Sequence, residues 1–288
     1  MLKYKIRDKV ELKSKPSLLN KFKKPKLIDY EELKEHINIK KVNLSQHDFS
    51  QFSKKHGNFN YTQAIRLFLV DHVIRNLKYS RVIEIGGAHG AFVSILNSNA
   101  EYITFDNSDF SLLPSNSIIK DDFINYLNAD FDANLLYLGH TFEHLSSNRD
   151  IELIDFYNLN FNKDSIAIIE PLFIGKEYLE FSRKYERFDH KADLATIDNN
   201  FCGSIKHGMG FARIYSPESF NERILLRIKE LDLHYTVLEF ELDNTPLPDF
   251  SKFQHKDMHI NSFLRVMLVS KSKELIEPYF PENTPAAL

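Results

Sequence analysis

The chain has 288 residues, of which 43% are hydrophobic and 27% are charged, and its formal net charge is -3. This composition is typical of a folded globular protein, and it gives no cationic excess that would attract nucleic acid or an acidic membrane surface. The single cysteine, Cys202, excludes an internal disulfide and fits a reducing compartment. The N-terminus lacks the apolar core of a signal peptide, and no apolar run is long enough to span a bilayer, so we expect a cytoplasmic protein.

Residues 1–60 are polar and rich in lysine, and we interpret them as an N-terminal arm with short helical stretches, one of them at 30–36. Apolar residues then recur at helical spacing over 61–79, which predicts an amphipathic helix with Thr62 as its N-cap. The remaining chain, 61–288, is expected to form one domain. We expect the aromatic residues of the arm, such as Phe49 and Phe52, to fold over the mouth of that domain's binding site; the alternative is that they pack on the sheet edge.

Short apolar segments alternate with helical segments from residue 80 onward. The predicted strands are RVIEI (81–85), EYITFD (101–106), SIIKDD (117–122), ANLLYLGH (133–140), SIAIIEPLF (165–173), LHYTVLEFEL (233–242) and SFLRVMLVS (262–270). Helices are predicted at 91–98 and 144–160. Because strands that alternate with helices are joined by right-handed crossovers, this pattern predicts an α/β fold with a mostly parallel sheet, helices on both faces and a C-terminal antiparallel strand pair.

Three of the nine glycines fall within five residues, directly after the first predicted strand. Such clustering predicts a tight turn whose backbone approaches a ligand at the carboxyl edge of the sheet. Gly86 permits the turn, Gly87 leaves the backbone uncovered, and Gly90 lets the next helix pack close to the strand. Glu84 lies inside the strand, where a carboxylate needs a partner. Asp106 ends the second strand and can accept hydrogen bonds from two neighbouring ribose hydroxyls.

The segment EIGGAHG resembles the first motif of class I S-adenosylmethionine-dependent methyltransferases, acid-x-Gly-x-Gly-x-Gly. Glu84, Gly86 and Gly90 match this motif, Ala88 takes the place of the middle glycine, and Gly87 lies one place early. The dinucleotide signature G-x-G-x-x-G is not met, which disfavours NAD, and the lysine of a P-loop is absent.

The resemblance extends over about residues 60–270 in the order of the elements. FDANLLYLGHTFEHL resembles the family's segment FD-apolar-strand-x-H-x-x-E-H-L, with His140, Glu143 and His144 in register. The resemblance implies a Rossmann-like sheet of seven strands and S-adenosyl-L-methionine as the cofactor. The cofactor contacts that it implies come from Glu84, Gly86, Gly87, Ala88, Gly90, Asp106, Asn107, Asp121, Asp122, Phe123 and His140. In this set Asp106 would bind the ribose, Asp121 or Asp122 the adenine amino group, and Phe123 would stack on or flank the base.

Histidines supply the candidate bases, because a hydroxyl acceptor must lose a proton during transfer. His140 follows the fourth strand, and we expect it to act as a general base or to position the acceptor; the alternative is that it caps the helix near Thr141. His207 is the second candidate. The pair Glu143 and His144 is more often structural than catalytic in the family, and His144 is the third candidate.

The connection 174–215 after the fifth strand is long, and connections of that length are usually functional. We expect an acceptor-binding lid, although a solvated surface loop is the alternative. Its basic side chains favour a phosphorylated or acidic acceptor: Arg183, Arg187, His190, His207 and Arg213. After the lid, Ser216 is predicted to cap a helix with Pro217 at its first position.

The lid also contains oxygen and imidazole groups that could hold a divalent cation. They belong to Asp189, His190, Asp193, Asp198 and His207. No tight ligand spacing such as H-E-x-x-H occurs among them, so no metal site is predicted.

The sequence therefore predicts a methyltransferase for a small polar acceptor, with O-methylation of a sugar, phosphorylated or nucleotide-linked intermediate, for example of surface polysaccharide synthesis. Three alternatives stay open: N-methylation of a small amine, an NAD-dependent oxidoreductase, and a non-catalytic methyltransferase-like subunit, which Ala88 would favour. Nucleic acid is disfavoured as a substrate because LGHTF stands where an Asn/Asp-Pro-Pro-Tyr/Phe segment would follow the fourth strand. A monomer and a homodimer are both compatible with the sequence.

Overall fold

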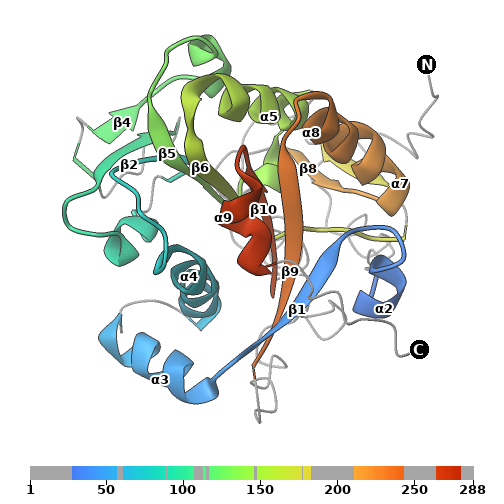
Figure 1. The fold of residues 1–288 in the computed structure, drawn as a ribbon, viewed down its shortest axis with the longest axis horizontal. Coiled ribbons are helices and arrows are strands. Elements are labelled where there is room, and N and C mark those ends of the chain that lie inside the picture. The colour runs from blue at the N-terminus through green and yellow to red at the C-terminus, as the bar shows by residue number, and fades with distance from the viewer. Residues whose placement is uncertain are drawn as a thin grey trace, which may run out of the picture.

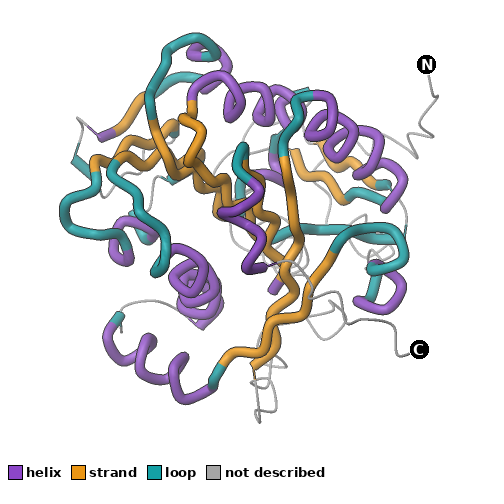
Figure 2. Tube along the Cα trace, in the orientation of Figure 1, coloured by secondary structure: helices purple, strands orange, loops and turns teal. Residues whose placement is uncertain are grey.

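The computed structural model of the chain contains one large mixed sheet with helices packed around it (Figure 1). The structure describes residues 28–56, 61–87, 90–106, 113–114, 117–145, 148–176, 178–182, 211–242 and 264–279. The sheet has eight strands in the order β1-β9-β10-β6-β5-β2-β3-β4, and these strands cross the middle of the molecule (Figure 2). None of the helices within these described ranges is long and apolar enough to cross a bilayer.

The strand order and directions confirm the predicted fold class. The strands are β1 (Ile39–Leu44), β2 (Arg81–Ile85), β3 (Glu101–Phe105), β4 (Ile118–Ile119), β5 (Ala133–Gly139), β6 (Phe161–Glu170), β9 (His234–Leu242) and β10 (Arg265–Ser270). The pairs β2·β3, β2·β5, β3·β4 and β5·β6 are parallel, whereas β10 is antiparallel to both of its neighbours, β6 and β9. The C-terminal antiparallel pair is therefore present, as predicted.

Strand β1 is an eighth strand that the sequence analysis did not predict. It pairs in parallel with β9 and forms one edge of the sheet. Lys40 and Lys41 interrupt its apolar pattern, and lysines are common on edge strands because they discourage pairing with another chain. Part of the expected arm therefore belongs to the sheet, and the domain boundary at residue 60 stays a prediction.

The helices agree with the predictions best where the apolar pattern is long. They are α2 (Tyr30–Leu33), α3 (Gln46–Lys55), α4 (Tyr61–Ile74), α5 (Arg149–Asn160), α7 (Pro217–Phe220), α8 (Leu226–Glu230) and α9 (Lys273–Ile276), with the π-helical turn η6 (Asn221–Leu225) joining α7 to α8. The 3-10 turns in the described part of the chain are η1 (Phe92–Ile95), η3 (Phe123–Tyr126), η4 (Phe142–His144) and η9 (Glu277–Tyr279).

Several predicted boundaries were wrong. The helix expected at 91–98 is only the short turn η1, and the helix expected from 144 begins at Arg149. Thr62 lies inside α4, which begins at Tyr61, and not before it. The cap at Ser216 is confirmed, because its side chain accepts a hydrogen bond from Ser219 in a capping box.

Two apolar cores fill the two faces of the sheet, as a sheet with helices on both faces requires. Along β6, Ala167 and Ile169 belong to one core, while Ile166 and Ile168 belong to the other. The first core also takes residues from α5 and α8, and the second from α3 and α4. Figure 1 shows α5 beside α8, and α3 beside α4 at the opposite side of the sheet.

The two ends of the predicted lid meet each other. Strands β7 (Leu179–Ser182) and β8 (Phe211–Ile214) form a separate antiparallel pair. The lid residues predicted to bind an acceptor or considered for a metal, Arg183, Arg187, Asp189, His190, Asp193, Asp198 and His207, lie outside the described residues. Arg213 is described and is discussed with the site.

Candidate functional site

The turn after β2 has a backbone that only glycine fits at Gly86. Its φ is +83°, in the left-handed region that side chains disfavour. A Cβ at this position would lie 2.2 Å from Oγ1 of Thr141. The Gly86 N–H donates to the carbonyl of Phe105 at 2.8 Å. The turn therefore packs between the carboxyl ends of β3 and β5. This is the edge of the sheet where ligands bind in open α/β sheets.

Gly87 and Gly90 are also constrained by their neighbours. A Cβ on Gly87 would lie 2.5 Å from the carboxyl carbon of Glu84, so the Glu84 side chain occupies the space that a side chain at Gly87 would need. Gly90 has a φ of +63°, and a Cβ there would meet Leu113 at 2.8 Å. The expected reason for Gly90, close packing of the next helix, was wrong, because the left-handed backbone and Leu113 require the glycine. Ala88 and Asn107 lie outside the described residues.

Glu84 is a buried carboxyl group with a defined partner. Its side chain is 5% exposed, and the Tyr102 hydroxyl donates to its Oε2. Burial raises the pKa of Glu84 to about 8, even though the Tyr102 hydrogen bond favours the ionised form, and Asp106 adds to the rise. Glu84 is therefore mostly protonated at neutral pH and would ionise readily beside a bound cation.

Asp106 lies beside the glycine turn. Ile85 of β2 is paired with Phe105 of β3, so the next residues, Gly86 and Asp106, follow neighbouring strands at the same edge. The Asp106 N–H donates to the carbonyl of Ile119 at 3.1 Å, which fixes the backbone there. The position suits the predicted contact with a ribose, and that contact stays a prediction.

The two acids after β4 bind neighbouring residues of their loop and of α5. Asp122 caps η3 by accepting from the Ile124 N–H at 3.3 Å, and its other oxygen lies 3.0 Å from Nε of Arg149. Asp121 accepts from the side-chain amide of Asn125 at 2.8 Å. Both carboxylates therefore stabilise the loop, and a contact with adenine would be additional to these bonds.

Phe123 lies in the apolar core. It is 4% exposed, and its ring packs edge-on against Phe156 with the ring centroids 5.4 Å apart. In this position its ring supports the loop, and the predicted contact, in which Phe123 stacks on or flanks the base, stays a prediction.

His140 has an unusual backbone and a carboxylate partner. Its φ is +52°, and its N–H donates to the carbonyl of Glu170 at 2.8 Å. Left-handed backbone at a non-glycine residue costs energy and is concentrated at functional sites. Nδ1 of His140 lies 2.8 Å from Oε1 of Glu143, which is 2% exposed and also lies 3.5 Å from Nε2 of His144.

This contact defines the protonation of the imidazole ring. Because a carboxylate only accepts, Nδ1 of His140 donates, and in the neutral ring Nε2 carries the lone pair. Burial lowers the pKa of His140, and the nearby Arg66 guanidinium adds to that effect. Burial opposes ionisation of Glu143, but the attraction of His144 and His140 outweighs it and lowers the pKa of Glu143. His140 is therefore a neutral base on a charged carboxylate at neutral pH.

Three polar residues next to His140 were missed by the sequence analysis. Arg66 donates from Nε and Nη2 to the two carboxylate oxygens of Glu170 at 2.7 Å and 2.6 Å, and the Tyr137 hydroxyl donates to the same carboxylate at 2.5 Å. A Cβ on Gly139 would lie 2.4 Å from that hydroxyl, so the cluster packs directly beneath the backbone that leads to His140. The signal was present in the sequence as one charged residue within each of the apolar segments AIRLFLV and IAIIEP.

Arg213 does not face an acceptor. It is 1% exposed, and its Nη1 lies 2.5 Å from Oδ2 of Asp150, which is fully buried. Arg223 and the Tyr215 hydroxyl bind the same carboxylate. The expectation that Arg213 belongs to an acceptor-binding set was wrong, because its charge is neutralised in the core.

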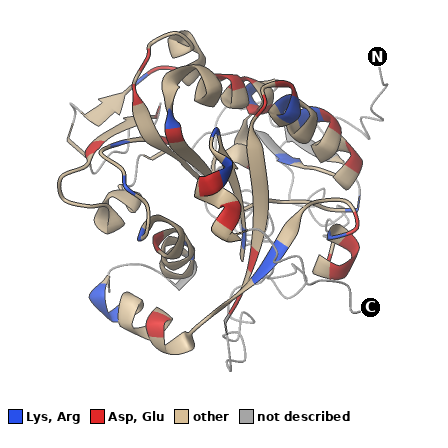
Figure 3. Cartoon of the chain, viewed as in Figure 1, with Lys and Arg blue, Asp and Glu red and all other residues tan. Residues whose placement is uncertain are grey.

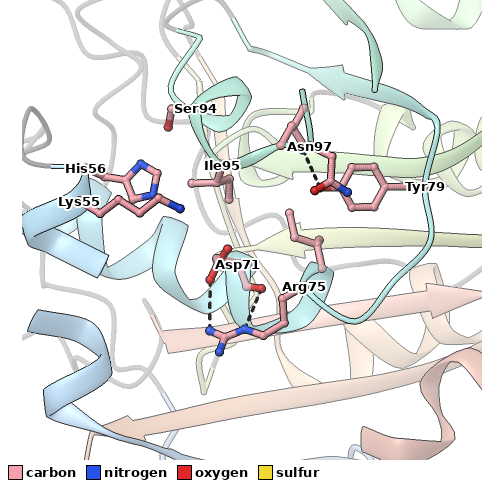
Figure 4. A pocket seen from close by; sticks show the side chains of 10 residues that line it. Lys55, His56, Asp71, Arg75, Tyr79, Ser94, Ile95 and Asn97 are labelled. Atoms are coloured by element: carbon pink, nitrogen blue, oxygen red, sulfur yellow. Dashed lines mark hydrogen bonds and ion pairs between the residues drawn. The ribbon is translucent and has the colours of Figure 1, made fainter. Parts of the chain in front are cut away.

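A pocket of about 260 Å³ lies between α3, α4 and η1 (Figure 4). Asp71 of α4 and Arg75, which follows that helix, form an ion pair on one side of it, and the Asn97 N–H donates to the Tyr79 hydroxyl on the other. None of the predicted site residues lines this pocket. Charges of both signs are interspersed along the described elements (Figure 3), so the candidate site is distinguished by its geometry at the sheet edge.

The order of the strands decides the fold family. From β4 the order runs β3, β2, β5, β6, β10 and β9, with β10 antiparallel to both neighbours. This is the sheet that the resemblance implied, with β1 added at one edge. The chain has the fold of the class I methyltransferases. The glycine turn, Asp106 and His140 all lie at the carboxyl edge of this methyltransferase-type sheet.

No protein-family model and no curated protein matches the sequence. Among solved structures, a SAM-dependent methyltransferase from Archaeoglobus fulgidus is 16% identical over 77% of this chain and 97% of that chain, with a TM-score of 0.45. A possible histamine N-methyltransferase from Thermotoga maritima is 15% identical over 78% of this chain and 99% of its own, with a TM-score of 0.42. The plantazolicin methyltransferase BpumL, solved in complex with S-adenosylhomocysteine, is 12% identical over 78% of this chain and 91% of its own, with a TM-score of 0.44. The fold assignment depends on the strand order of this chain and not on these likenesses.

Proposed function

We propose that this protein is an S-adenosylmethionine-dependent methyltransferase that acts on a small polar acceptor. The observation that carries the proposal is the glycine turn, where Gly86 and Gly87 have no room for a side chain and Glu84 and Asp106 lie beside the backbone. The sulfonium and ammonium of the cofactor are cations, and the carboxyl groups of Glu84 and Asp106 complement them and the ribose hydroxyls. When bound, the cofactor supplies an activated methyl group for direct displacement.

The His140–Glu143 pair supports transfer to oxygen. A hydroxyl must lose its proton as it attacks, and Nε2 of a neutral His140 can accept that proton while the Glu143 carboxylate stabilises the imidazolium. The oxygen then attacks the methyl carbon, and the carbon–sulfur bond breaks with its electron pair going to sulfur. His207 is the second candidate base, and His144 is a weaker one because it is buried against Glu143. An amine acceptor is the alternative.

The proposed acceptor is a sugar, or a phosphorylated or nucleotide-linked intermediate, as in surface polysaccharide synthesis. Support comes from the basic residues of 174–215 such as Arg183, Arg187 and His190, since charge-assisted hydrogen bonds bind phosphate and carboxylate groups strongly. Because Arg213 forms a buried ion pair with Asp150, this proposal depends on the other basic residues of the lid. A cytoplasmic location, with a monomer or homodimer, would fit such a role.

Titration with S-adenosylhomocysteine (SAH) and with NADH tests the proposed cofactor. We expect SAH to bind and NADH not to bind, because the turn lacks the dinucleotide signature. The Asp106→Ala variant should weaken SAH binding by roughly tenfold or more, since it removes a carboxylate expected to hold two ribose hydroxyls. Asp48→Ala, at an exposed position of helix α3, serves as the control. NADH binding in place of SAH would favour the oxidoreductase, and SAH binding without turnover on any acceptor pool would favour the non-catalytic subunit.

Cofactor binding is expected to release a proton through Glu84. The pKa of Glu84 is about 8 in the empty site, so at pH 7 the group is mostly protonated, and a cation placed beside it favours the ionised form. We expect release of about one proton per SAH bound at pH 7, and affinity that rises between pH 6 and 8 and then levels off. Calorimetry in two buffers of different ionisation enthalpy measures the release.

The Glu84→Gln variant is the control for this linkage. It should bind SAH more weakly, with no proton release and a flat dependence on pH over the same range. A wild-type protein that binds SAH with no proton exchange would show that Glu84 does not face the ligand.

A further inference from the structure

Arg66 places a positive charge beside the carboxyl groups of the candidate site. The carboxyl groups at this edge of the sheet belong to Glu84, Asp106, Glu143 and Glu170. The positive charge of Arg66 favours ionisation of Glu84 and opposes protonation of His140. It therefore lies close enough to act on both the glycine turn and the loop after β5, although α4, which carries it, precedes both elements in the chain.

The guanidinium group is held in one orientation by a buried carboxylate. Glu170 is 1% exposed and binds Nε and Nη2 of Arg66 at 2.7 Å and 2.6 Å, while the arginine side chain is 12% exposed. Nη1 makes no hydrogen bond to a residue in the described ranges, and the side chain as a whole is not fully buried. A planar guanidinium that is fixed along one edge offers its remaining N–H groups to a second anion in a defined direction.

The proposed cofactor carries an α-amino acid, whose ammonium and carboxylate are separated by a single carbon. Glu84 matches the ammonium, and a carboxylate next to that ammonium requires a cation or several N–H donors. We propose that Arg66 binds the carboxylate of the amino-acid moiety, so that Glu84 and Arg66 together recognise the zwitterion. This inference rests on the proposed function, and it names a ligand-binding residue outside the glycine motif.

The test compares two nucleosides that differ in the amino-acid moiety. SAH carries the carboxylate, whereas 5′-methylthioadenosine has the same adenosine and thioether but no amino acid. The variant is the double substitution Arg66→Gln and Glu170→Gln, because removing the arginine alone would leave a buried carboxylate unpaired. Arg75→Gln is the matched control, since Arg75 directly follows the same helix, is exposed and pairs with Asp71.

We expect the double variant to weaken SAH binding roughly 10- to 100-fold, the range for a lost hydrogen bond to a charged group, and to leave methylthioadenosine binding within about twofold. Glu170→Gln alone should retain SAH binding, because Arg66 remains. Equal weakening of both nucleosides by the double variant would show that Arg66 acts only through the packing of the sheet edge and would overturn the inference.

Unchanged SAH binding in the double variant would also overturn the inference. If that variant also had a raised KM for the acceptor, Arg66 would bind an anionic group of the acceptor and not of the cofactor. A wild-type protein that binds neither nucleoside would overturn the proposed function itself, and this inference with it.

Discussion

Replacing His140 with asparagine is expected to lower the turnover number of methyl transfer by about 10²- to 10⁴-fold, the usual contribution of a general base. Asparagine is the suitable replacement because it tolerates the left-handed backbone, which has a φ of +52° at this position. The variant therefore removes the base without straining the loop. SAH affinity, measured by calorimetry, should stay near the wild-type value, which separates the loss of chemistry from the loss of binding.

The pH dependence of kcat/KM gives a second test of the role of His140, because it reports the protonation of that residue. His140 must be neutral to accept a proton, and its pKa is lowered from the ordinary value near 6.5 by burial and by Arg66. Activity should therefore fall on the acidic side only below about pH 6.5, as the pH passes through the lowered pKa. In the Glu143→Gln variant this acidic fall in activity should occur at still lower pH, because the Glu143 carboxylate raises the pKa of His140.

His36→Asn is the control, because His36 is exposed beyond α2. Its turnover and pH profile should match the wild type. Wild-type turnover in His140→Asn would remove His140 from the mechanism and leave His207 as the candidate base.

The sequence was sufficient where the determining interactions are local. The strand RVIEI, the glycine turn and Asp106 lie within one short stretch of chain, and the apolar pattern with its glycines predicts all three. Even there the partner of Glu84 could not be named: the need for a partner follows from burial, but Tyr102 is placed beside it by the pairing of β2 with β3.

The parts that could not be predicted depend on pairing between distant segments. Arg66 and Glu170 are 104 residues apart in sequence, and only the packing of α4 against the end of β6 brings them together. Strand β1 was missed for the same reason, since its parallel partner β9 lies almost two hundred residues further along the chain. The role of Arg213 depended on Asp150 in the same way.

Replacing Asp150 with asparagine is expected to lower the free energy of unfolding by about 3–5 kcal/mol, the range for breaking a buried ion pair by removing one partner. Asp150 is fully buried, and its carboxylate binds Nη1 of Arg213 at 2.5 Å, Nη2 of Arg223 at 2.8 Å and the Tyr215 hydroxyl at 2.7 Å. Without that carboxylate, two guanidinium groups would lose the buried negative charge that binds them both. Urea denaturation followed by circular dichroism at pH 7 measures the loss.

Asp155→Asn is the matched control, because Asp155 lies on the same helix, is 25% exposed and binds Arg227. We expect it to lower the free energy of unfolding by less than about 1 kcal/mol, as the loss of a partly exposed ion pair does.

Burial would raise the pKa of Asp150, but the hydrogen bond from Arg223 and the charge of Arg213 outweigh it and lower that pKa. The stabilisation by Asp150 is therefore present at every pH above the unfolded-state pKa near 3.8 and is lost only as the pH falls through the lower folded-state value. An Asp150→Asn variant as stable as Asp155→Asn would mean that the two arginines find other partners. In that case β8, which carries Arg213 at the base of the predicted lid, would not depend on this carboxylate for its position.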